Sequence, residues 1–150
     1  SRGLGDVYKR QDFIVQEYGR NLGLKTVCFR AGCITGPNHS GAKLHGFLSY
    51  LIKQSLLKKE YTILGYKGKQ VRDNLHSFDL INCFWEYFKK PKRGMVYNIG
   101  GGRFSNCSIL EAISEIEYMA KIKIKRKFFK QNRVGDHIWY ITNNNKFKKD

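Results

Sequence analysis

The stretch Val71-Arg72-Asp73-Asn74-Leu75-His76-Ser77-Phe78-Asp79 decides the fold, because it follows a turn at Gly68 and contains the start of a helix. Ser77 can cap a helix whose apolar residues recur at the helical period until a proline ends it. Upstream, Gly36-Pro37 closes an apolar strand. Downstream, Met95–Ile99 is typical of a buried strand, and Gly100-Gly101-Gly102 of the turn beyond it. Strands that alternate with helices predict an α/β architecture.

The remaining elements follow from the same patterns. Asp12 can cap a helix that ends at Gly23, and Ser108 with Glu111 can form a capping box before another helix. The strand at Thr26–Phe29 is apolar on both faces, as expected for a central parallel strand between helices. The other predicted elements are a helix at Leu44–Lys58 and strands at Tyr61–Leu64, around Ile122–Phe129 and at His137–Thr142.

The composition favours a folded chain. Its 150 residues, 41% of them hydrophobic and 14% aromatic, suffice for one domain with a real core. The longest nearly apolar run, Phe47–Ile52, is far shorter than the about 20 residues that span a bilayer. We therefore expect a soluble protein without a membrane partner.

The charge is strongly positive. Lysine and arginine outnumber aspartate and glutamate by 28 to 12, which gives a net charge of +16. Such a balance attracts polyanions through counterion release, so a basic module that binds RNA or another polyanion is one hypothesis. Most lysines, however, occupy polar positions of amphipathic elements, as in Lys121-Ile122-Lys123-Ile124-Lys125. This pattern favours a solvated face and no nucleic-acid partner.

The four cysteines give no metal signature. Cys28, Cys33, Cys83 and Cys107 form no C-x-x-C and have no histidine at zinc-finger spacing. We expect no metal site, and structural thiols in a reducing compartment such as the cytoplasm.

Four segments occur in an order that is specific to one family. They are FRAGCITGPNHSG from residue 29, LHGFLSYL from residue 44, GYKGKQVRDNLHS from residue 65 and VYNIGGG from residue 96. In this order they resemble the extended short-chain dehydrogenase/reductase family of NAD-dependent nucleotide-sugar epimerases and dehydratases, from about Asp12 to the C-terminus. The resemblance implies the rear part of a Rossmann-like parallel sheet plus a small mixed α/β substrate-binding domain. It also implies NAD as cofactor, a nucleotide-sugar substrate and a possible homodimer of the full-length protein.

Two parts of that family's machinery have no counterpart in this sequence. No G-x-G-x-x-G or G-x-x-G-x-x-G turn is present to hold a dinucleotide pyrophosphate. None of the nine tyrosines is followed four residues later by lysine, the family's catalytic pair. Residues 1–11, SRGLGDVYKRQ, fit neither the family nor a targeting signal and resemble a translated sequencing adapter. We therefore expect residues 12–150 to be the C-terminal part of an epimerase, inactive alone, with catalytic residues supplied upstream.

The candidate residues for the diphosphate of a nucleotide sugar are Arg72 and Arg133. A guanidinium pairs two phosphate oxygens at once, and both arginines match positions where the family grips the diphosphate. Asp73 and Asp136 follow them closely enough to orient them by hydrogen bonds, although a structural role is equally open. His76 fits a structural cap better than a catalytic role.

The resemblance to the family implies which residues would contact the nicotinamide, the sugar and the base. Ala31, Gly32 and Cys33 leave the carboxyl end of a central strand, where ligands bind in open α/β sheets, and would pass beside the nicotinamide. Three more residues would close over the sugar and base, namely Asn38, His45 and Phe47. Thr62 would belong to an edge strand that meets the base. Packing alone also accounts for Gly32 and Phe47.

Two rival functions remain open. One is a nucleotide-sugar dehydratase or reductase of the same superfamily, which pocket residues and product analysis would distinguish from an epimerase. The other is the polyanion-binding module, which clustered cations and exposed aromatics on one face would favour.

Overall fold

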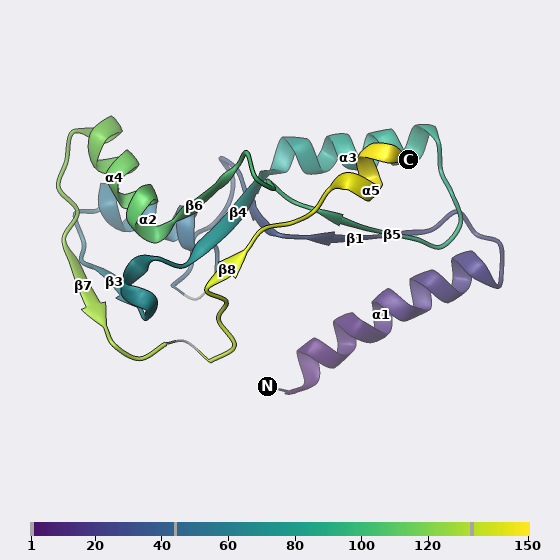
Figure 1. Ribbon diagram of the computed structural model, residues 1–150, viewed down its shortest axis with the longest axis horizontal. Coiled ribbons are helices and arrows are strands. Elements are labelled where there is room, and N and C mark those ends of the chain that lie inside the picture. The colour runs from purple at the N-terminus through teal and green to yellow at the C-terminus, as the bar shows by residue number, and fades with distance from the viewer. Residues whose placement is uncertain (1, 44, 133) are drawn as a thin grey trace.

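The computed structural model describes residues 2–43, 45–132 and 134–150. Its elements form two regions that lie at opposite ends of an elongated molecule (Figure 1). The first, called here the paired-strand region, is a parallel pair of strands, β1 (Val27–Ala31) and β5 (Met95–Ile99). Helix α1 (Arg2–Arg20) lies on one face of this pair, and α3 (Ser77–Lys89) with α5 (Asn145–Lys149) on the other.

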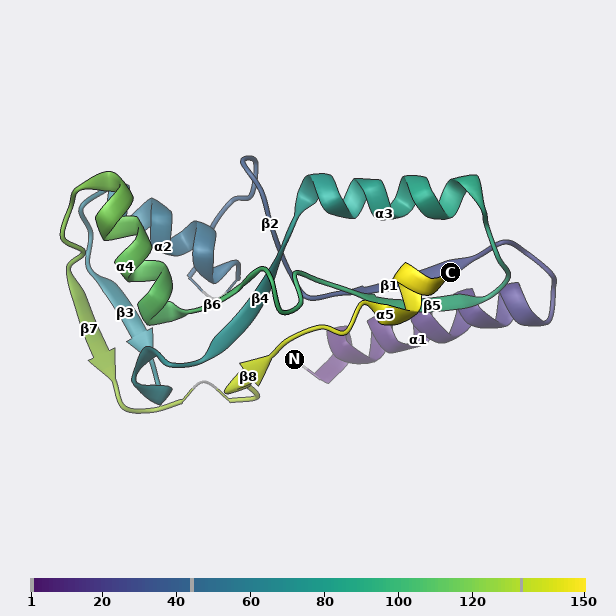
Figure 2. The same cartoon turned by 45° about the horizontal axis from the view of Figure 1, so that its top comes forward.

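The second region, called here the mixed-sheet region, is built around β4 (Val71–His76). This strand pairs in parallel with β2 and β8 and antiparallel with β6, while β3 and β7 form a separate parallel pair (Figure 2). Helices α2 and α4 pack together over β3. The bounds of these elements are β2 (Cys33–Thr35), α2 (Phe47–Leu56), β3 (Tyr61–Leu64), the 3₁₀ turn η1 (Tyr66–Gly68), β6 (Asn106–Ser108), α4 (Ile109–Ala120), β7 (Arg126–Phe129) and β8 (Trp139–Tyr140).

Each region has its own apolar core. The larger core joins α2, β3 and α4 and consists of Leu51, Tyr61, Ile63, Ile109, Ala112, Ile113 and Ile124. The smaller one lies at the paired-strand region and consists of Tyr97 and Ile99 of β5 together with Leu75, which comes from the end of β4. Half-buried side chains from β1, α3 and α5 pack around it, among them Phe29 against Phe147.

The carboxylate of Asp73 connects the two regions. Asp73 lies in β4 and is 0% exposed. Its Oδ2 accepts hydrogen bonds from the backbone N–H of Gly102, beyond β5, at 3.0 Å and from that of Thr142 at 2.9 Å. Gly32 allows this approach, because a Cβ there would lie 2.7 Å from Asp73 Oδ1. Asp73 therefore has a structural role, and among the described residues no hydrogen bond joins it to Arg72.

Three helix starts differ from the prediction. Helix α1 already begins at Arg2, so Asp12 is not its cap; its carboxylate instead pairs with Arg30 at 2.8 Å, which lowers the pKa of Asp12. Helix α2 begins at Phe47 because Gly46 adopts φ 71°, which breaks the helix, and Leu44 lies outside the described residues. The cap of α3 is His76, whose Nδ1 accepts from the N–H of Phe78, so the prediction of Ser77 as cap is wrong.

The strands were predicted more accurately where they are buried. β3 and β5 have the predicted bounds, and the capping box at Ser108 and Glu111 is confirmed. β7 begins at Arg126, because the N–H of Ile124 donates to the Glu117 carboxylate and leaves no ladder bond. β8 ends at Tyr140, since the chain then turns toward Asp73. The short strands β2 and β6 were not predicted.

The basic segment around β7 supports the solvated-face prediction. All four residues of β7 are exposed, and cations of this segment pair with nearby carboxylates: Lys123 with Glu117 at 3.4 Å and Lys127 with Glu60 at 2.9 Å. Exposed aromatic side chains do lie beside them, at Phe128 and Phe129. The polyanion hypothesis thus stays a prediction.

Candidate functional site

A cavity of about 200 Å³ opens in the mixed-sheet region between β3, β4 and the start of α2. Five of the predicted site residues line it: Cys33, His45, Phe47, Thr62 and Arg72. They come from five separate parts of the chain, namely β2, the loop before α2, α2 itself, β3 and β4. The other lining residues that matter below are Lys43, Tyr50, Tyr61, Leu64, Gln70 and Asp136.

Arg72 is held firmly in the wall of this cavity. Its position in the middle strand β4, between β6 and β8, leaves its side chain only 13% exposed. The guanidinium donates through Nη1 to the carbonyl of Val71 at 2.7 Å, and through Nη2 to the Asp136 carboxylate and the carbonyl of His137. These bonds fix the side chain while leaving part of its donor set available to an anion.

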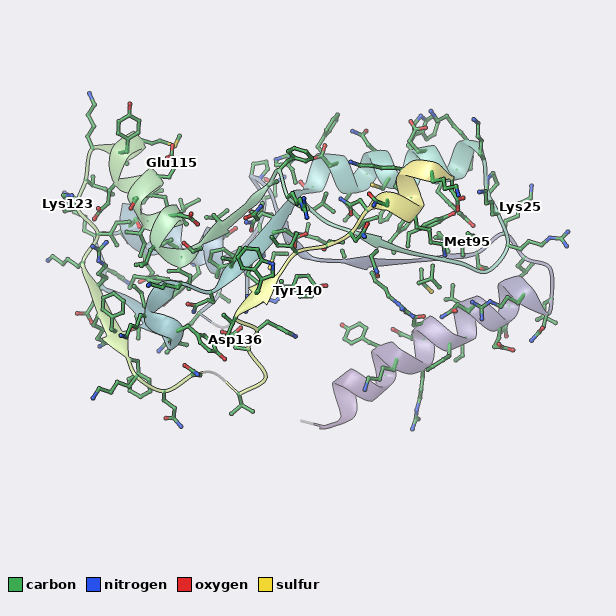
Figure 3. All side chains as sticks on the ribbon, viewed as in Figure 1. Lys25, Met95, Glu115, Lys123, Asp136 and Tyr140 are labelled. Atoms are coloured by element: carbon green, nitrogen blue, oxygen red, sulfur yellow. The ribbon has the colours of Figure 1, made fainter. Side chains whose placement is uncertain are left out.

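Asp136 lies in the loop between β7 and β8, close to the start of β8 (Figure 3). It pairs with Arg72, 64 positions away in the sequence. Asp136 was predicted to orient Arg133, the arginine that it follows; the structure instead pairs it with Arg72, and its relation to Arg133 stays a prediction. The hydroxyl of Tyr66 also donates to the Asp136 carbonyl, at 3.4 Å, which ties this loop to η1. Arg133, the second candidate for the diphosphate, lies outside the described residues, so the convergence of the two arginines stays a prediction.

The loop before α2 is folded tightly onto that helix. Ala42 and His45 exchange two backbone hydrogen bonds, at 3.1 and 3.0 Å. The His39 ring lies where a Cβ of Gly46 would stand, and its Nδ1 lies 3.1 Å from Ser49 Oγ. This packing brings His45 to the cavity.

Asn38 does not line this cavity. It lies at an adjoining hollow of about 510 Å³, which it shares with Gly32, Cys33 and His45. Cys33 and His45 line both spaces, so the two hollows meet along β2 and the loop before α2. A ligand larger than the first cavity could extend from one into the other.

Burial changes the pKa of two side chains in the cavity wall, Tyr61 and Cys33. Burial raises the pKa of Tyr61 to about 12. Burial also raises the pKa of the Cys33 thiol, although the positive charge of Arg72 acts in the opposite direction. Tyr61 and Cys33 therefore serve as neutral walls of the cavity.

The segment predicted to border a nicotinamide fits NAD only in part. Cys33 faces both hollows, but Ala31 lines neither, and the small size of Gly32 is required by Asp73. A dinucleotide also needs a glycine-rich turn against a helix N-terminus, and the sequence contains no such motif. The residues present do not fit the pyrophosphate of NAD, and we derive no hydride step from them.

Several lining residues were not predicted as site residues, notably Lys43, Tyr50 and Gln70. Tyr50 follows the helical period of α2 and is indistinguishable from a core residue in the sequence. Lys43 is one of many lysines. Gln70 precedes β4 and carries no local signal, so only the tertiary arrangement reveals it.

Two negative findings bear on the site. Over residues 2–43, 45–132 and 134–150, no group of three or more His, Cys, Asp or Glu side chains could hold a metal ion. Within the same residues, no helix has the length and hydrophobicity needed to cross a membrane. All four cysteines are free thiols.

Comparison with models of protein families shows the family to which the chain belongs. The model of the NAD dependent epimerase/dehydratase family matches residues 10–100, which is more than half of the chain. The chain belongs to the NAD-dependent epimerase/dehydratase family. Its α/β architecture with parallel strands is that of the family's Rossmann-fold members, as predicted.

Individual epimerase/dehydratase family members are similar over most of the chain. CDP-paratose 2-epimerase of Salmonella typhi is 30% identical over 132 residues, covering 83% of this chain and 37% of that protein. The chain thus spans little more than a third of the length of this curated relative.

Solved structures of the family show the same fold. UDP-glucuronic acid 4-epimerase from Bacillus cereus, in complex with UDP-glucuronic acid and NAD, has a TM-score of 0.77 and 28% identity, covering 92% of this chain and 42% of that one. dTDP-glucose 4,6-dehydratase from Bacillus anthracis, in complex with NAD, has a TM-score of 0.75 and 26% identity with the same coverages. These relatives are NAD-bound enzymes that include an epimerase and a dehydratase.

Proposed function

We propose that this chain is the substrate-binding part of an NAD-dependent nucleotide-sugar epimerase similar to CDP-paratose 2-epimerase. Residues 12–150 bind and orient the nucleotide sugar, and residues 1–11 have no part in the function. NAD would supply the hydride chemistry of such an enzyme, and the residues that would hold its pyrophosphate and transfer the proton belong to sequence beyond this chain. The chain alone neither retains NAD nor turns over.

The observation that carries this proposal is the convergence of residues on one cavity. Predicted positions from β2, the loop before α2, β3 and β4 meet there, with the fixed cation Arg72 in the wall. A fixed guanidinium suits a diphosphate because its orientation needs little further ordering when the anion binds. Lys43 and His45 border the same space and add donors.

The other lining residues accommodate the uncharged parts of the ligand. Phe47 and Tyr50 come from α2, and Thr62 and Leu64 from β3, so the base lies between a helix and an edge strand. Arg133 would add a second cation to the diphosphate. In this arrangement Arg72 supplies charge neutralisation, whereas the helix and strand exclude water from the base.

Titration of the chain with uridine diphosphate and with uridine tests the assignment of Arg72. Wild type should bind the diphosphate more tightly than the nucleoside, because only the former reaches the guanidinium. Arg72→Ala should weaken diphosphate binding by about 2–5 kcal/mol and leave uridine binding nearly unchanged. Arg93→Ala, which removes an exposed arginine from the paired-strand region, is the matched control. An Arg72→Ala variant that kept the full preference for the diphosphate would show that the assignment is wrong.

A fusion to the NAD-binding half of a relative tests the activity. The fusion, with its Tyr-x-x-x-Lys pair, should epimerise a nucleotide sugar, since a positioned acid/base contributes about 10²–10⁴-fold. Arg72→Ala in this fusion should raise KM for the nucleotide sugar while the amount of bound NAD stays the same. If the variant instead lost NAD and kept normal affinity for the nucleotide sugar, the assignment of Arg72 to the nucleotide sugar would be wrong.

A dehydratase is the second candidate, and the similarity to dTDP-glucose 4,6-dehydratase favours it. Product analysis of the fusion distinguishes the two, because an epimerase product has the composition of its substrate and a dehydratase product has lost water. We also propose that the full-length enzyme is cytoplasmic, in keeping with the four free thiols, and that it forms a homodimer. Sedimentation of the fusion would test the dimer.

A further inference from the structure

A second hollow lies outside the candidate site, where the turn beyond β5 meets the segment between β8 and α5 (Figure 1). It is an open space of about 710 Å³ and shares none of its described lining residues with the candidate cavity. Two cations, Arg103 and Lys148, and two aromatic side chains, Phe104 and Trp139, line it. We call this hollow the basic groove, and the proposed function makes no use of it.

The cations of the basic groove are available to an anion. Arg103 and Lys148 are exposed, and their side chains form no ion pair or hydrogen bond within the part of the chain that the structure describes. The described residues that line the groove include no aspartate or glutamate. The cations beside β7 differ, because Lys123 and Lys127 pair with carboxylates. The basic groove therefore complements a negatively charged ligand better than the β7 segment does.

The aromatic side chains of the basic groove are exposed on a loop that is held in place. Phe104 is 96% exposed and Trp139 is 64% exposed. The side chain of Asn144 bonds to both the N–H and the carbonyl of Gly100, at 3.0 and 2.8 Å. The hydroxyl of Ser105 donates to a carbonyl of β4 at 2.7 Å. An aromatic ring on such a fixed loop can stack on a flat ligand with little loss of conformational freedom.

We propose that the basic groove binds single-stranded RNA, with phosphates at Arg103 and Lys148 and bases stacked on Phe104 and Trp139. Proteins that bind single strands combine cations along the nucleic-acid backbone with aromatic rings on which the bases stack. The groove meets the condition set for a polyanion-binding module, namely cations and exposed aromatic side chains on one face. The sequence favoured no nucleic-acid partner because of segments such as residues 121–125, which do not line the groove.

The combination of charge and exposed rings favours a single strand over other polyanions. The bases of a duplex are stacked on one another and cannot reach protein side chains with their flat faces, whereas unpaired bases can. An acidic peptide would pair with the two cations but would leave the aromatic rings without flat partners. RNA is the single strand that is available in the cytoplasm, where we place the enzyme.

Fluorescence anisotropy with a labelled RNA of about 12 nucleotides tests the stacking. The wild-type chain should bind this single strand more tightly than a duplex of the same sequence. Phe104→Ala should weaken binding about fivefold to a hundredfold, which is the effect of losing one stacked base. Phe128→Ala is the matched control, because it removes a 57% exposed aromatic side chain beside the cations of β7 and should leave the affinity unchanged. Phe104 is almost fully exposed, so its substitution should preserve the fold.

The salt dependence of binding tests the contact to phosphate. The logarithm of the affinity should fall linearly with the logarithm of the salt concentration, because bound cations release counterions from the RNA. Arg103→Ala should reduce the slope of this line by about 0.7, the value for one phosphate contact to a single strand. An unchanged slope in Arg103→Ala would show that Arg103 does not contact the backbone.

Four other results would overturn the proposal. They are the absence of RNA binding at up to about 100 μM protein, equal or tighter binding of the duplex or of an acidic peptide, an equal loss of affinity in Phe104→Ala and Phe128→Ala, and displacement of the RNA by uridine diphosphate. The last result would place the RNA in the candidate cavity instead of the basic groove. None of these outcomes depends on the assignment of Arg72, so the proposed function and this inference can fail separately.

Discussion

The paired-strand region and the mixed-sheet region bury their apolar residues to different degrees. In the mixed-sheet region, the α2 and α4 helices enclose β3 and a seven-residue core. In the paired-strand region, only three residues form the buried core, and α3 carries an exposed apolar face at Phe78, Ile81, Trp85 and Phe88. The region with the cavity is thus well enclosed, whereas the Rossmann-like region leaves apolar surface uncovered among the described residues.

This difference follows from the position of β1. The sequence of β1 is apolar on both faces, which is typical of a central strand, yet its only partner in the part of the chain that the structure describes is β5. Its residues are accordingly half-buried or exposed. The composition of a strand reflects the sheet that it evolved in, and a mismatch between composition and burial marks where further strands would pair.

Asp73→Ala should have the largest effect, because it breaks the connection between the two regions. The substitution leaves the N–H groups of Gly102 and Thr142 without their buried acceptor, at a cost of about 1–3 kcal/mol each. Chemical denaturation should show the loss. Hydrogen exchange should show the turn beyond β5 opening while the core of α2, β3 and α4 stays protected.

Asp73→Asn serves as the control, because both bonds go to Oδ2 and an amide oxygen in that position can still accept them. It should lose less stability than the alanine variant. Uniform loss of protection from hydrogen exchange across both regions in Asp73→Ala would show that the paired-strand region and the mixed-sheet region unfold as one unit.

The sequence predicted an element correctly where residues close together in the chain determine its bounds. β3, β5 and the Ser108 capping box were predicted because buried runs and capping residues act over a few positions. β2 and β6 were missed because each has three residues and exists only through pairing with β4. The start of α1 was misplaced because Asp12 can cap a helix but instead binds Arg30.

The same difference between local and long-range contacts explains which site residues the sequence could predict. Family motifs indicated Arg72, Thr62 and His45, and the structure brings them to one cavity. The bond between Arg72 and Asp136 and the basic groove depend on contacts between distant segments. Such contacts leave no periodic or local trace in a single sequence.

Substitution of Ile81 and Trp85 by lysine should reduce the exposed apolar surface of the paired-strand region and so test its difference from the mixed-sheet region. The wild-type chain should bind a hydrophobic dye and self-associate, because these side chains are 58% exposed on α3. The double variant should bind markedly less dye, with stability changed by no more than about 0.5 kcal/mol. Tyr118→Lys, at an 81% exposed position on α4, is the control and should leave dye binding nearly unchanged. A monomeric wild-type chain that binds no dye and melts cooperatively would contradict the difference between the regions.

The smallest expected effect is the pH dependence of the capping box in the mixed-sheet region. The backbone N–H of Ser108 donates to the Glu111 carboxylate at 2.7 Å, which lowers the pKa of Glu111 below its ordinary value of 4.5. A group with a lowered folded pKa adds stability that is complete above its unfolded pKa and is lost as the pH falls through the folded one. Glu111→Gln should therefore be less stable than wild type by a few tenths of a kcal/mol at pH 7, since solvent screens this exposed carboxylate. The gap should close below about pH 4, where both side chains are uncharged. Denaturation curves of both proteins between pH 3 and pH 7 would measure it, and a gap that widened toward acid would show that the charged form of Glu111 does not stabilise the helix.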